Sequence, residues 1–301
     1  MDVKPFLKWV GGKTQILETV LDLFPTAMKS YHEPFLGGGS VLLGFLNKVR
    51  DGRIELTGQV YASDLNVHLI SLYKNVQERP TELIAAVKVL TDEFALCTGS
   101  VVNRKPTTTE EARTSVESYY YWIRQRFNAV PVAEREGVAA SAMFLFLNKT
   151  CFRGVYREGP RGFNVPFGHY KNPTIVTEQH IHDVSELIQG VIFTQQSFQD
   201  SFVAVASGDF VYLDPPYAPE QATSFVGYTA DGFNLDSHKN LFTLTKEMKE
   251  RNAGMLMSNA AVPLVKEAFP SPAYTTRIIS CRRAINSKEP ASRTNEVLIR
   301  G

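Results

Sequence analysis

The sequence predicts an α/β fold, in which an open sheet domain is interrupted by an inserted helical and hairpin segment. Short apolar strands alternate with helical segments in residues 1–66 and again in 174–301, the pattern of an open sheet with helices on its faces. Residues 67–173 lack that alternation and contain helices followed by a turn-rich stretch. We therefore predict a sheet domain made of 1–66 and 174–301, and a separate inserted domain at 67–173.

Composition and charge limit the class of protein. The 301 residues are 44% hydrophobic and 21% charged, which is typical of a globular chain with a buried core. The net charge is +1, so a nucleic-acid partner would need a local basic patch. No apolar run approaches the ~20 residues of a membrane span, and no signal peptide follows Met1. We expect an intracellular protein, in the cytoplasm or nucleoid, or in a host cell.

The three cysteines, Cys97, Cys151 and Cys281, are widely separated and odd in number. They fit reduced thiols, and no pair has the spacing of zinc ligands, so we predict no metal site. The sequence contains no internal repeat and no low-complexity tract.

The chain opens with a glycine turn, Gly11-Gly12-Lys13, followed by apolar residues at helical spacing from Thr14 to Phe24. A lysine beside a glycine turn at a helix start is typical of a phosphate-binding P-loop. The P-loop needs a glycine five residues before Gly12, and that residue is Leu7, so we reject this interpretation. The two glycines still allow a ligand to approach the backbone closely, with Trp9 and Lys13 on either side.

A second glycine turn, Gly37-Gly38-Gly39, precedes Ser40 and the apolar run Val41–Leu46. It predicts a strand-to-helix turn with Ser40 near the N-cap, where a nucleoside cofactor lies against the backbone of an open α/β sheet. Val60–Asp64 reads as the next strand, and its terminal acid comes about 25 residues after the glycines, as expected of a ribose-binding carboxylate. No arginine near Asp64 could receive a 2′-phosphate, so an adenosine-containing cofactor other than NADP is favoured.

Four helical segments follow, at 67–77, 81–97, 110–128 and 134–148, and Pro80 and Pro106 separate the first three. The third segment carries an aromatic cluster, which favours a core face over a binding surface. Arginine is rarely buried without a partner, so we expect Arg124 and Arg126 on this helix to be paired or exposed.

Residues 149–171 are rich in glycine and proline, which predicts loops and a hairpin. The segment has a single acidic residue, Glu158. It has five basic residues, interleaved with aromatic ones: Lys149, Arg153, Arg157, Arg161 and Lys171. Basic and aromatic residues on a turn-rich segment suit phosphate contacts and insertion into a DNA groove. We interpret the segment as a nucleic-acid contact, with a solvated basic loop as the alternative.

The most distinctive stretch is Asp209–Tyr217, a short apolar strand that stops at Asp214-Pro215-Pro216-Tyr217. Two prolines donate no backbone N–H, so neither a sheet nor a helix continues through them. Asp214 and the Pro215 carbonyl could accept hydrogen bonds from the amine of a flat ring, and Tyr217 could stack on its face. The alternative is an ordinary strand exit with a core tyrosine.

The remaining pattern completes the sheet domain. We predict helices at 178–188 and 236–250 and strands at 191–195, 254–258, 275–281 and 296–299. A polar basic loop, which contains Arg283 and Lys288, connects the last two strands.

Taken together, these stretches resemble the Dam family of DNA adenine-N6 methyltransferases, the D12 class of α-group amino-methyltransferases, over nearly the whole chain. The likeness is carried by five blocks in the family order: Pro5–Lys13, Glu33–Val41, Asp64, Leu147–Gly168 and Asp214–Tyr217. The resemblance implies a seven-stranded, Rossmann-like methyltransferase sheet that binds S-adenosylmethionine. It also implies that the insert is the target-recognition domain that binds DNA.

The site residues follow from the matched positions. The resemblance implies cofactor contacts from Trp9, Lys13, Phe35, Gly37, Gly39, Asp64, Phe198 and Asp214, and catalysis by Asp214, Pro215, Pro216 and Tyr217. Lys8, Arg157, Pro166 and Tyr170 match residues that read bases, and we expect Arg124, Asn128 and Arg153 to bind DNA as well. The usual family target is the adenine of GATC. This sequence departs from the family pattern at Cys151-Phe152-Arg153 and at His169, which leaves a related short site open.

We therefore predict a site-specific, adenine-specific DNA methyltransferase that flips its target base out of duplex DNA. The same fold acting on cytosine N4, an idle DNA-binding protein and an NAD-dependent dehydrogenase are the alternatives. Cytosine-C5 chemistry needs a thiolate, usually after a proline, and none of the three cysteines follows one. The expected partner is double-stranded DNA, bound by a monomer and without a membrane. The setting stays open between repair, restriction–modification with a companion nuclease, a phage and a virus.

Overall fold

The computed structural model describes residues 2–171, 173–219, 233–282 and 293–301. It forms two compact units. The helical unit comprises Met1–Gly12, Gly37–Leu43 and Asn66–Gln189, and the sheet unit comprises Lys13–Leu36, Gly44–Leu65 and Gly190–Gly301. Arg283 and Lys288 of the predicted basic loop lie outside the described residues.

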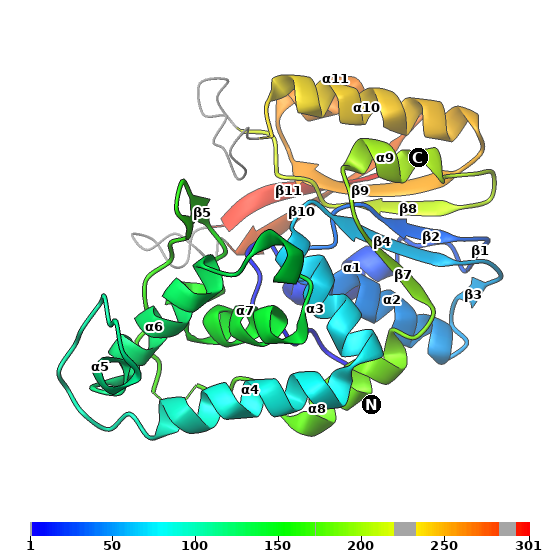
Figure 1. Cartoon of the computed structure of the whole chain (residues 1–301). Helices are drawn as coiled ribbons and strands as arrows, with labels where there is room; N and C mark the ends of the chain where they lie inside the picture. Colours follow the sequence, from blue (N-terminus) through cyan, green and yellow to red (C-terminus); the bar gives the residue numbers. More distant parts are fainter. Residues whose placement is uncertain (1, 172, 220–232, 283–292) are drawn as a thin grey trace. The chain divides into compact units, whose positions relative to one another are not determined.

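The sheet unit is built on a seven-stranded mixed sheet (Figure 1). In spatial order its strands are β10 (Thr275–Arg282), β11 (Arg293–Arg300), β9 (Gly254–Ala260), β8 (Phe210–Leu213), β2 (Tyr31–Glu33), β4 (Val60–Asp64) and β7 (Val191–Gln195). β11 runs antiparallel to both of its neighbours, and every other neighbouring pair is parallel. The predicted α/β class and its seven-stranded sheet are confirmed. A separate parallel pair consists of β1 (Ala27–Met28) and β3 (Glu55–Leu56).

Strand β2 lies at the point where the strand order reverses. Its neighbour on one side is β4, the next strand of the sheet along the chain. Its neighbour on the other side is β8, which begins only at Phe210. In open α/β sheets, ligands bind outside the carboxyl ends of the strands at such a point. The ends of β2 and β8, at Glu33 and Leu213, border it.

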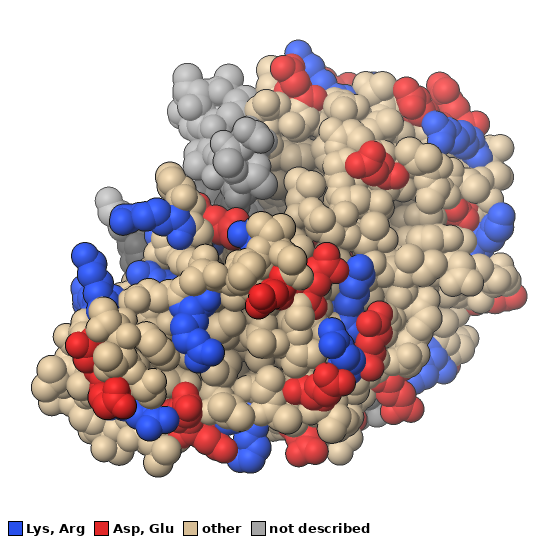
Figure 2. Space-filling model, in the orientation of Figure 1, with Lys and Arg blue, Asp and Glu red and all other residues tan. Residues whose placement is uncertain are grey.

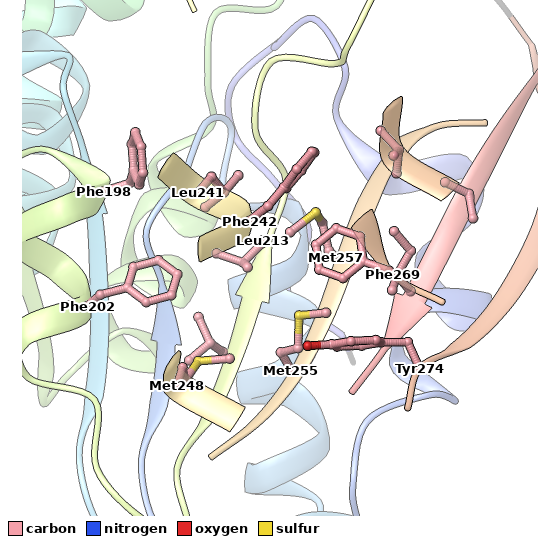
Figure 3. Close-up of a cluster of buried hydrophobic side chains, with 14 of the residues drawn as sticks. Phe198, Phe202, Leu213, Leu241, Phe242, Met248, Met255, Met257, Phe269 and Tyr274 are labelled. Atoms are coloured by element: carbon pink, nitrogen blue, oxygen red, sulfur yellow. The ribbon is translucent and has the colours of Figure 1, made fainter. Parts of the chain in front are cut away.

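Helices cover both faces of this sheet (Figure 1). On one face lie α9 (Phe198–Val203), α10 (Leu235–Glu250) and α11 (Pro263–Ala268). Figure 3 shows side chains of α9 and α10 packed with those of β8 and β9. On the other face lie α1 (Leu17–Leu21), preceded by the turn η1 (Lys13–Gln15), and the second half of α2 (Ser40–Arg50). All four residues of β8 are buried because the strand is covered on both sides, which explains its unbroken apolar run.

The helical unit is arranged around a central helix, α7 (Val138–Thr150), which packs against α3 (Val67–Glu78), α4 (Pro80–Ala95) and α6 (Val116–Asn128). Phe144 to Leu147 of α7 are all buried, as expected of a helix surrounded by others. The unit is completed by α5 (Thr109–Ala112), η2 (Val132–Glu134), η3 (Phe152–Gly154), the hairpin strands β5 (Glu158–Gly159) and β6 (Gly162–Phe163), and α8 (Glu178–Leu187). The aromatic cluster of α6 is core, as predicted: Tyr119, Tyr120 and Tyr121 are buried.

Several helices of the structure differ in extent from those predicted from the sequence. The segment 110–128 forms two helices, because the Ser115 hydroxyl accepts the Ser118 N–H at 3.1 Å and caps a new helix. The helix predicted over Thr14–Phe24 ends at Leu21, shortly before Pro25, which disfavours helical geometry at the preceding residue. Helices α9 and α11 are six residues each and are missed because so short a run shows no clear helical period. None of the described helices is long and apolar enough to cross a membrane.

Candidate active site and DNA-binding hairpin

The exit of β8 carries an ion pair. Lys13 Nζ donates to Asp214 Oδ2 at 2.7 Å, and the two side chains are only 5% and 20% exposed. Lys13 Nζ also lies 5.1 Å from the centroid of the Tyr217 ring. Burial raises the pKa of Asp214, and the neighbouring Lys13 ammonium opposes this rise. Three residues predicted for the site thus meet within the sheet unit, at the carboxyl end of β8.

The bend after β8 is fastened to the next two strands of the sheet. The Tyr217 hydroxyl donates to Glu296 Oε2 at 2.7 Å, and the Ala218 N–H donates to Asn259 Oδ1 at 3.0 Å. Asn259 is fully buried, and its Oδ1 also accepts the Ala260 N–H at 2.8 Å. Because buried polar groups need partners, these bonds fix the path of the chain through Asp214–Tyr217.

A second carboxyl group lies at the end of β2. Glu33 is 2% exposed, and its Oε2 accepts a hydrogen bond from the Tyr31 hydroxyl at 2.6 Å. Burial raises the pKa of Glu33 to about 8; the Tyr31 hydrogen bond opposes that rise, and the charge of Asp214 adds to it. Glu33 is therefore largely protonated near neutral pH, unlike an exposed glutamate.

The predicted ribose-binding acid ends β4, and the segments that follow β2 and β7 are hydrogen-bonded to that strand end. Asp64 is the last residue of β4, and the Leu36 N–H donates to the carbonyl of the preceding Ser63 at 2.9 Å, so the chain after β2 passes the end of β4. Phe35 stacks on Phe198 with ring centroids 5.5 Å apart and planes at 27°. Phe198 is buried as the first residue of α9.

The glycine turn belongs to the helical unit and packs against that unit's own side chains. Gly37 and Gly39 have positive φ angles of 49° and 65°, which favour glycine. A Cβ on Gly37 would lie 3.0 Å from Trp9 Cδ1, and one on Gly39 would lie 2.1 Å from the Tyr73 hydroxyl oxygen. The Tyr73 hydroxyl donates to the Gly38 carbonyl at 3.0 Å. These glycines are thus required by internal packing, and their contact with a cofactor stays a prediction.

Lys8 lies against the segment that follows the hairpin. Its Nζ is 3.9 Å from the centroid of the Tyr170 ring, so two predicted base-reading residues are neighbours. Asn148 at the end of α7 holds the Lys8 backbone, accepting its N–H at 3.0 Å and donating to its carbonyl at 2.7 Å. Lys8 itself is exposed. No local sequence signal reveals this contact, because Lys8 and Asn148 are 140 residues apart in the chain.

Helix α6 holds the hairpin strand β6. Asn128 Nδ2 donates to the Phe163 carbonyl at 2.9 Å, and its Oδ1 accepts the Phe163 N–H at 2.8 Å. Arg124 donates to the Val165 carbonyl at 3.1 Å, and its guanidinium lies 4.6 Å from the centroid of the Tyr121 ring. In this structure Arg124 and Asn128 therefore position the hairpin, and direct contact of either with DNA stays a prediction.

The hairpin presents its predicted DNA-binding residues outward. Phe163, Val165 and Phe167 are buried, whereas Asn164 and Pro166 between them are exposed. Arg157 is exposed as well, and its Nε donates to Asn164 Oδ1 at 2.7 Å.

Arg153 precedes the hairpin in an exposed position. It has a positive φ of 56°, and its guanidinium lies 5.2 Å from the centroid of the Phe152 ring. On the face in view, Figure 2 shows Lys and Arg side chains gathered around β5, whereas acidic and basic side chains are interspersed over α4 and α8.

The comparison with known families decides the identity of the fold. A family model described as D12 class N6 adenine-specific DNA methyltransferase matches residues 9–284. The chain belongs to this family. It is accordingly an adenine-specific DNA methyltransferase that uses S-adenosylmethionine.

Three relatives illustrate the breadth of the family. The type II methyltransferase M.MjaIII of Methanocaldococcus jannaschii is 38% identical over 267 residues, which cover 86% of this chain and 85% of the relative. The DNA adenine methylase of Escherichia coli K12 is 32% identical over 286 residues, which cover 94% and 90%. The type II methyltransferase M1.LlaDCHI of Lactococcus lactis is 28% identical over 274 residues, which cover 89% and 85%.

The residues of this D12 methyltransferase suit its cofactor. An adenosine needs an apolar face for its base and an acceptor for its ribose hydroxyls, and the sheet unit offers Phe35, Phe198 and Asp64 at adjacent strand ends. Among the residues that the structure describes, no group of three His, Cys, Asp or Glu side chains could hold a metal ion.

Two further residues of the site, Asn259 and Glu296, have no role in the sequence prediction. A polar residue at the end of the apolar run Gly254–Ser258 could have drawn attention to Asn259. Glu296 has no such signal, because its place depends on the antiparallel pairing of β11 with β9.

Proposed function

We propose that this methyltransferase modifies adenine within GATC or a related short site in duplex DNA, and that Asp214 to Tyr217 act on a base flipped out of the helix. The observation that carries the proposal is the juxtaposition at the exit of β8. A carboxylate paired with Lys13 and an aromatic ring held by its hydroxyl stand on the two sides of a rigid Pro-Pro bend. This arrangement suits a flat ring with an exocyclic amine.

Asp214 and Pro215 orient the adenine amine. The N6 lone pair is delocalised into the ring and is a poor nucleophile, so it must be turned toward the methyl group. Hydrogen bonds from the N6–H groups to Asp214 and to the Pro215 carbonyl would favour a pyramidal nitrogen. S-adenosylmethionine supplies a methyl group on a sulfonium; as the C–N bond forms, the S–C bond breaks. Positioning of the two reactants supplies much of the rate in such a displacement.

Tyr217 receives the flipped base. Extrusion from the duplex costs a few kcal/mol of stacking and pairing. Stacking on an aromatic ring contributes about 1–3 kcal/mol per base and offsets part of that cost. The Pro-Pro bend and the hydrogen bond to Glu296 hold the ring before the base arrives.

The hairpin and Lys8 supply recognition. Lys8, Arg157, Pro166 and Tyr170 are assigned to base edges, and Arg153 to the DNA backbone. Exposure of Lys8, Arg153, Arg157 and Pro166 supports this assignment. Bidentate pairing of an arginine or lysine with guanine is the commonest specific contact in the major groove, which fits a site that contains guanine.

For the biological setting we propose two options, a restriction–modification system and a solitary methylase. Two relatives carry the name type II methyltransferase and another the name DNA adenine methylase. A companion restriction nuclease and a solitary methylase are both compatible with these names. We propose that the chain acts as a monomer on duplex DNA.

Replacement of Asp214 tests the catalytic proposal. Asp214→Ala is expected to bind S-adenosylmethionine with near-normal affinity and to lose methyl transfer by at least about 100-fold, because the amine loses its acceptor. Asp236→Ala removes an exposed carboxylate of the same unit and should transfer methyl normally. Near-normal turnover of Asp214→Ala would refute the role. The labelled product is identified by nucleoside analysis, since N4-methylcytosine would contradict the adenine target.

A further inference from the structure

Glu296 reaches the site through the direction of its strand. β11 is antiparallel to β9, with Glu296 opposite Ala260, so the first part of β11 lies at the same edge of the sheet as the carboxyl end of β9. Tyr217 follows β8, the parallel neighbour of β9. A parallel β11 would present its C-terminal residues at this edge instead. The antiparallel strand thus brings one carboxylate to within 2.7 Å of the Tyr217 hydroxyl.

The Tyr217 hydroxyl has two carboxylates as neighbours and one proton to donate. Glu296 Oε2 accepts this proton at 2.7 Å. Asp214 is the second carboxylate that interacts electrostatically with the Tyr217 hydroxyl. Burial raises the pKa of Tyr217 well above its ordinary value, and the charges of Asp214 and Glu296 raise it further, so the hydroxyl keeps its proton. Whichever carboxylate accepts this proton has less capacity left for a substrate N–H.

We propose that Glu296 is a positioning residue for methyl transfer. By accepting the Tyr217 hydroxyl proton it keeps that proton away from Asp214, which leaves the Asp214 carboxylate to bind adenine N6–H. Lys13 already engages Asp214 Oδ2. A second donor on Asp214 would compete directly with the substrate. The same bond holds the Tyr217 ring for stacking. This inference rests on the proposed roles of Asp214 and Tyr217.

The proposal predicts a specific pattern among four variants. Glu296→Ala frees the Tyr217 hydroxyl to turn to Asp214, and kcat should fall about tenfold, the effect expected of a hydrogen bond to a charged group. Glu296→Gln keeps an accepting oxygen and should stay within about threefold of the parent enzyme. Tyr217→Phe removes the competing proton but keeps the ring, and should lose less than Glu296→Ala. Adding Tyr217→Phe to Glu296→Ala should therefore restore activity to the level of Tyr217→Phe alone.

Two further measurements distinguish a loss of positioning from a general loss of protein structure. The affinity for S-adenosylmethionine should be unchanged in all four variants. The fluorescence of 2-aminopurine at the target position reports extrusion of the base, and its amplitude should fall in Glu296→Ala and recover in Glu296→Gln. Glu267→Ala removes an exposed carboxylate of the same unit and should behave as the parent enzyme.

Three results would overturn the proposal: normal kcat in Glu296→Ala, equal losses in Glu296→Ala and Glu296→Gln, or multiplied losses when Glu296→Ala and Tyr217→Phe are combined. The proposed function itself is tested separately by Tyr217→Ala and Asp214→Ala. If these two transfer methyl normally, the catalytic proposal fails. If they are inactive while Glu296→Ala is normal, only the role of Glu296 fails.

Discussion

At the scale of single residues, the site combines carboxyl groups with different charges. Asp214 is paired with Lys13, whereas Glu33 is buried with a tyrosine hydroxyl as its partner. Burial favours the neutral form of a carboxyl group, and a nearby cation favours the charged form. The site can therefore keep Asp214 as an anionic acceptor for the substrate while Glu33 stays a neutral acid.

Glu33 gives a prediction for stability against pH. Its pKa of about 8 in the folded chain lies above the ordinary value of 4.5, so the folded state holds a proton that the unfolded state has released. The resulting stability is complete below about pH 4.5 and is lost as the pH rises through 8. Over this interval Glu33 should lower the free energy of unfolding by up to roughly 1.4 kcal/mol per pH unit.

Glu33→Gln removes the titration and keeps an amide of the same shape. In urea unfolding at pH 5, 6, 7 and 8, the parent enzyme should lose stability relative to Glu33→Gln as the pH rises. Glu267→Gln, at an exposed position, serves as the matched control. Parallel stability curves for the parent enzyme and Glu33→Gln would show that Glu33 does not carry this proton.

At the scale of elements, the bend after β8 and the hairpin are both held in place by side chains of neighbouring elements. The bend after β8 is tied to β9 by Asn259 and to β11 by Glu296. The hairpin is tied to α6 by Asn128 and Arg124. Short segments with so few backbone hydrogen bonds of their own need such external partners to keep one conformation.

The bond between Asn128 and the hairpin can be tested against a matched position. Asn128→Ala breaks two hydrogen bonds to Phe163 and frees β6 from the helix. We expect a loss of about tenfold in kcat/KM for DNA, with unchanged affinity for S-adenosylmethionine. Gln125→Ala, at an exposed position on the same helix, should have no effect. Equal behaviour of the two variants would contradict the positioning role of Asn128.

The sequence predicted the elements whose ends carry strong local signals. The strand Val60–Asp64 was predicted with the bounds it has, and β8 was recognised because two prolines terminate an apolar run. The sequence could not reveal contacts that depend on register between distant strands, such as Tyr217 with Glu296. The sequence assigned Gly37 and Gly39 to a cofactor-binding turn. The structure adds a packing reason, since Trp9 and Tyr73 occupy the space of a side chain.

At the scale of the whole molecule, the residues proposed for chemistry and those proposed for recognition come from different parts of the chain. The residues proposed for transfer belong to the sheet unit, and those proposed to read DNA belong to the helical unit. The predicted insert at 67–173 lies within the helical unit, which also takes in residues 2–12, 37–43 and 174–189. That the insert alone recognises DNA stays a prediction. Family membership settles the adenine chemistry, and the short site that is read stays open to experiment.

One measurement tests the central claim most directly. Labelled methyl from S-adenosylmethionine is offered to two duplexes that differ in a single GATC site, and the products are separated as nucleosides. We predict label in N6-methyladenine with the GATC duplex alone. Equal labelling of both duplexes would contradict GATC recognition and point to a different site read by the hairpin. Label in N4-methylcytosine, or none in either duplex while the cofactor binds, would contradict the assigned action of Asp214–Tyr217 on adenine.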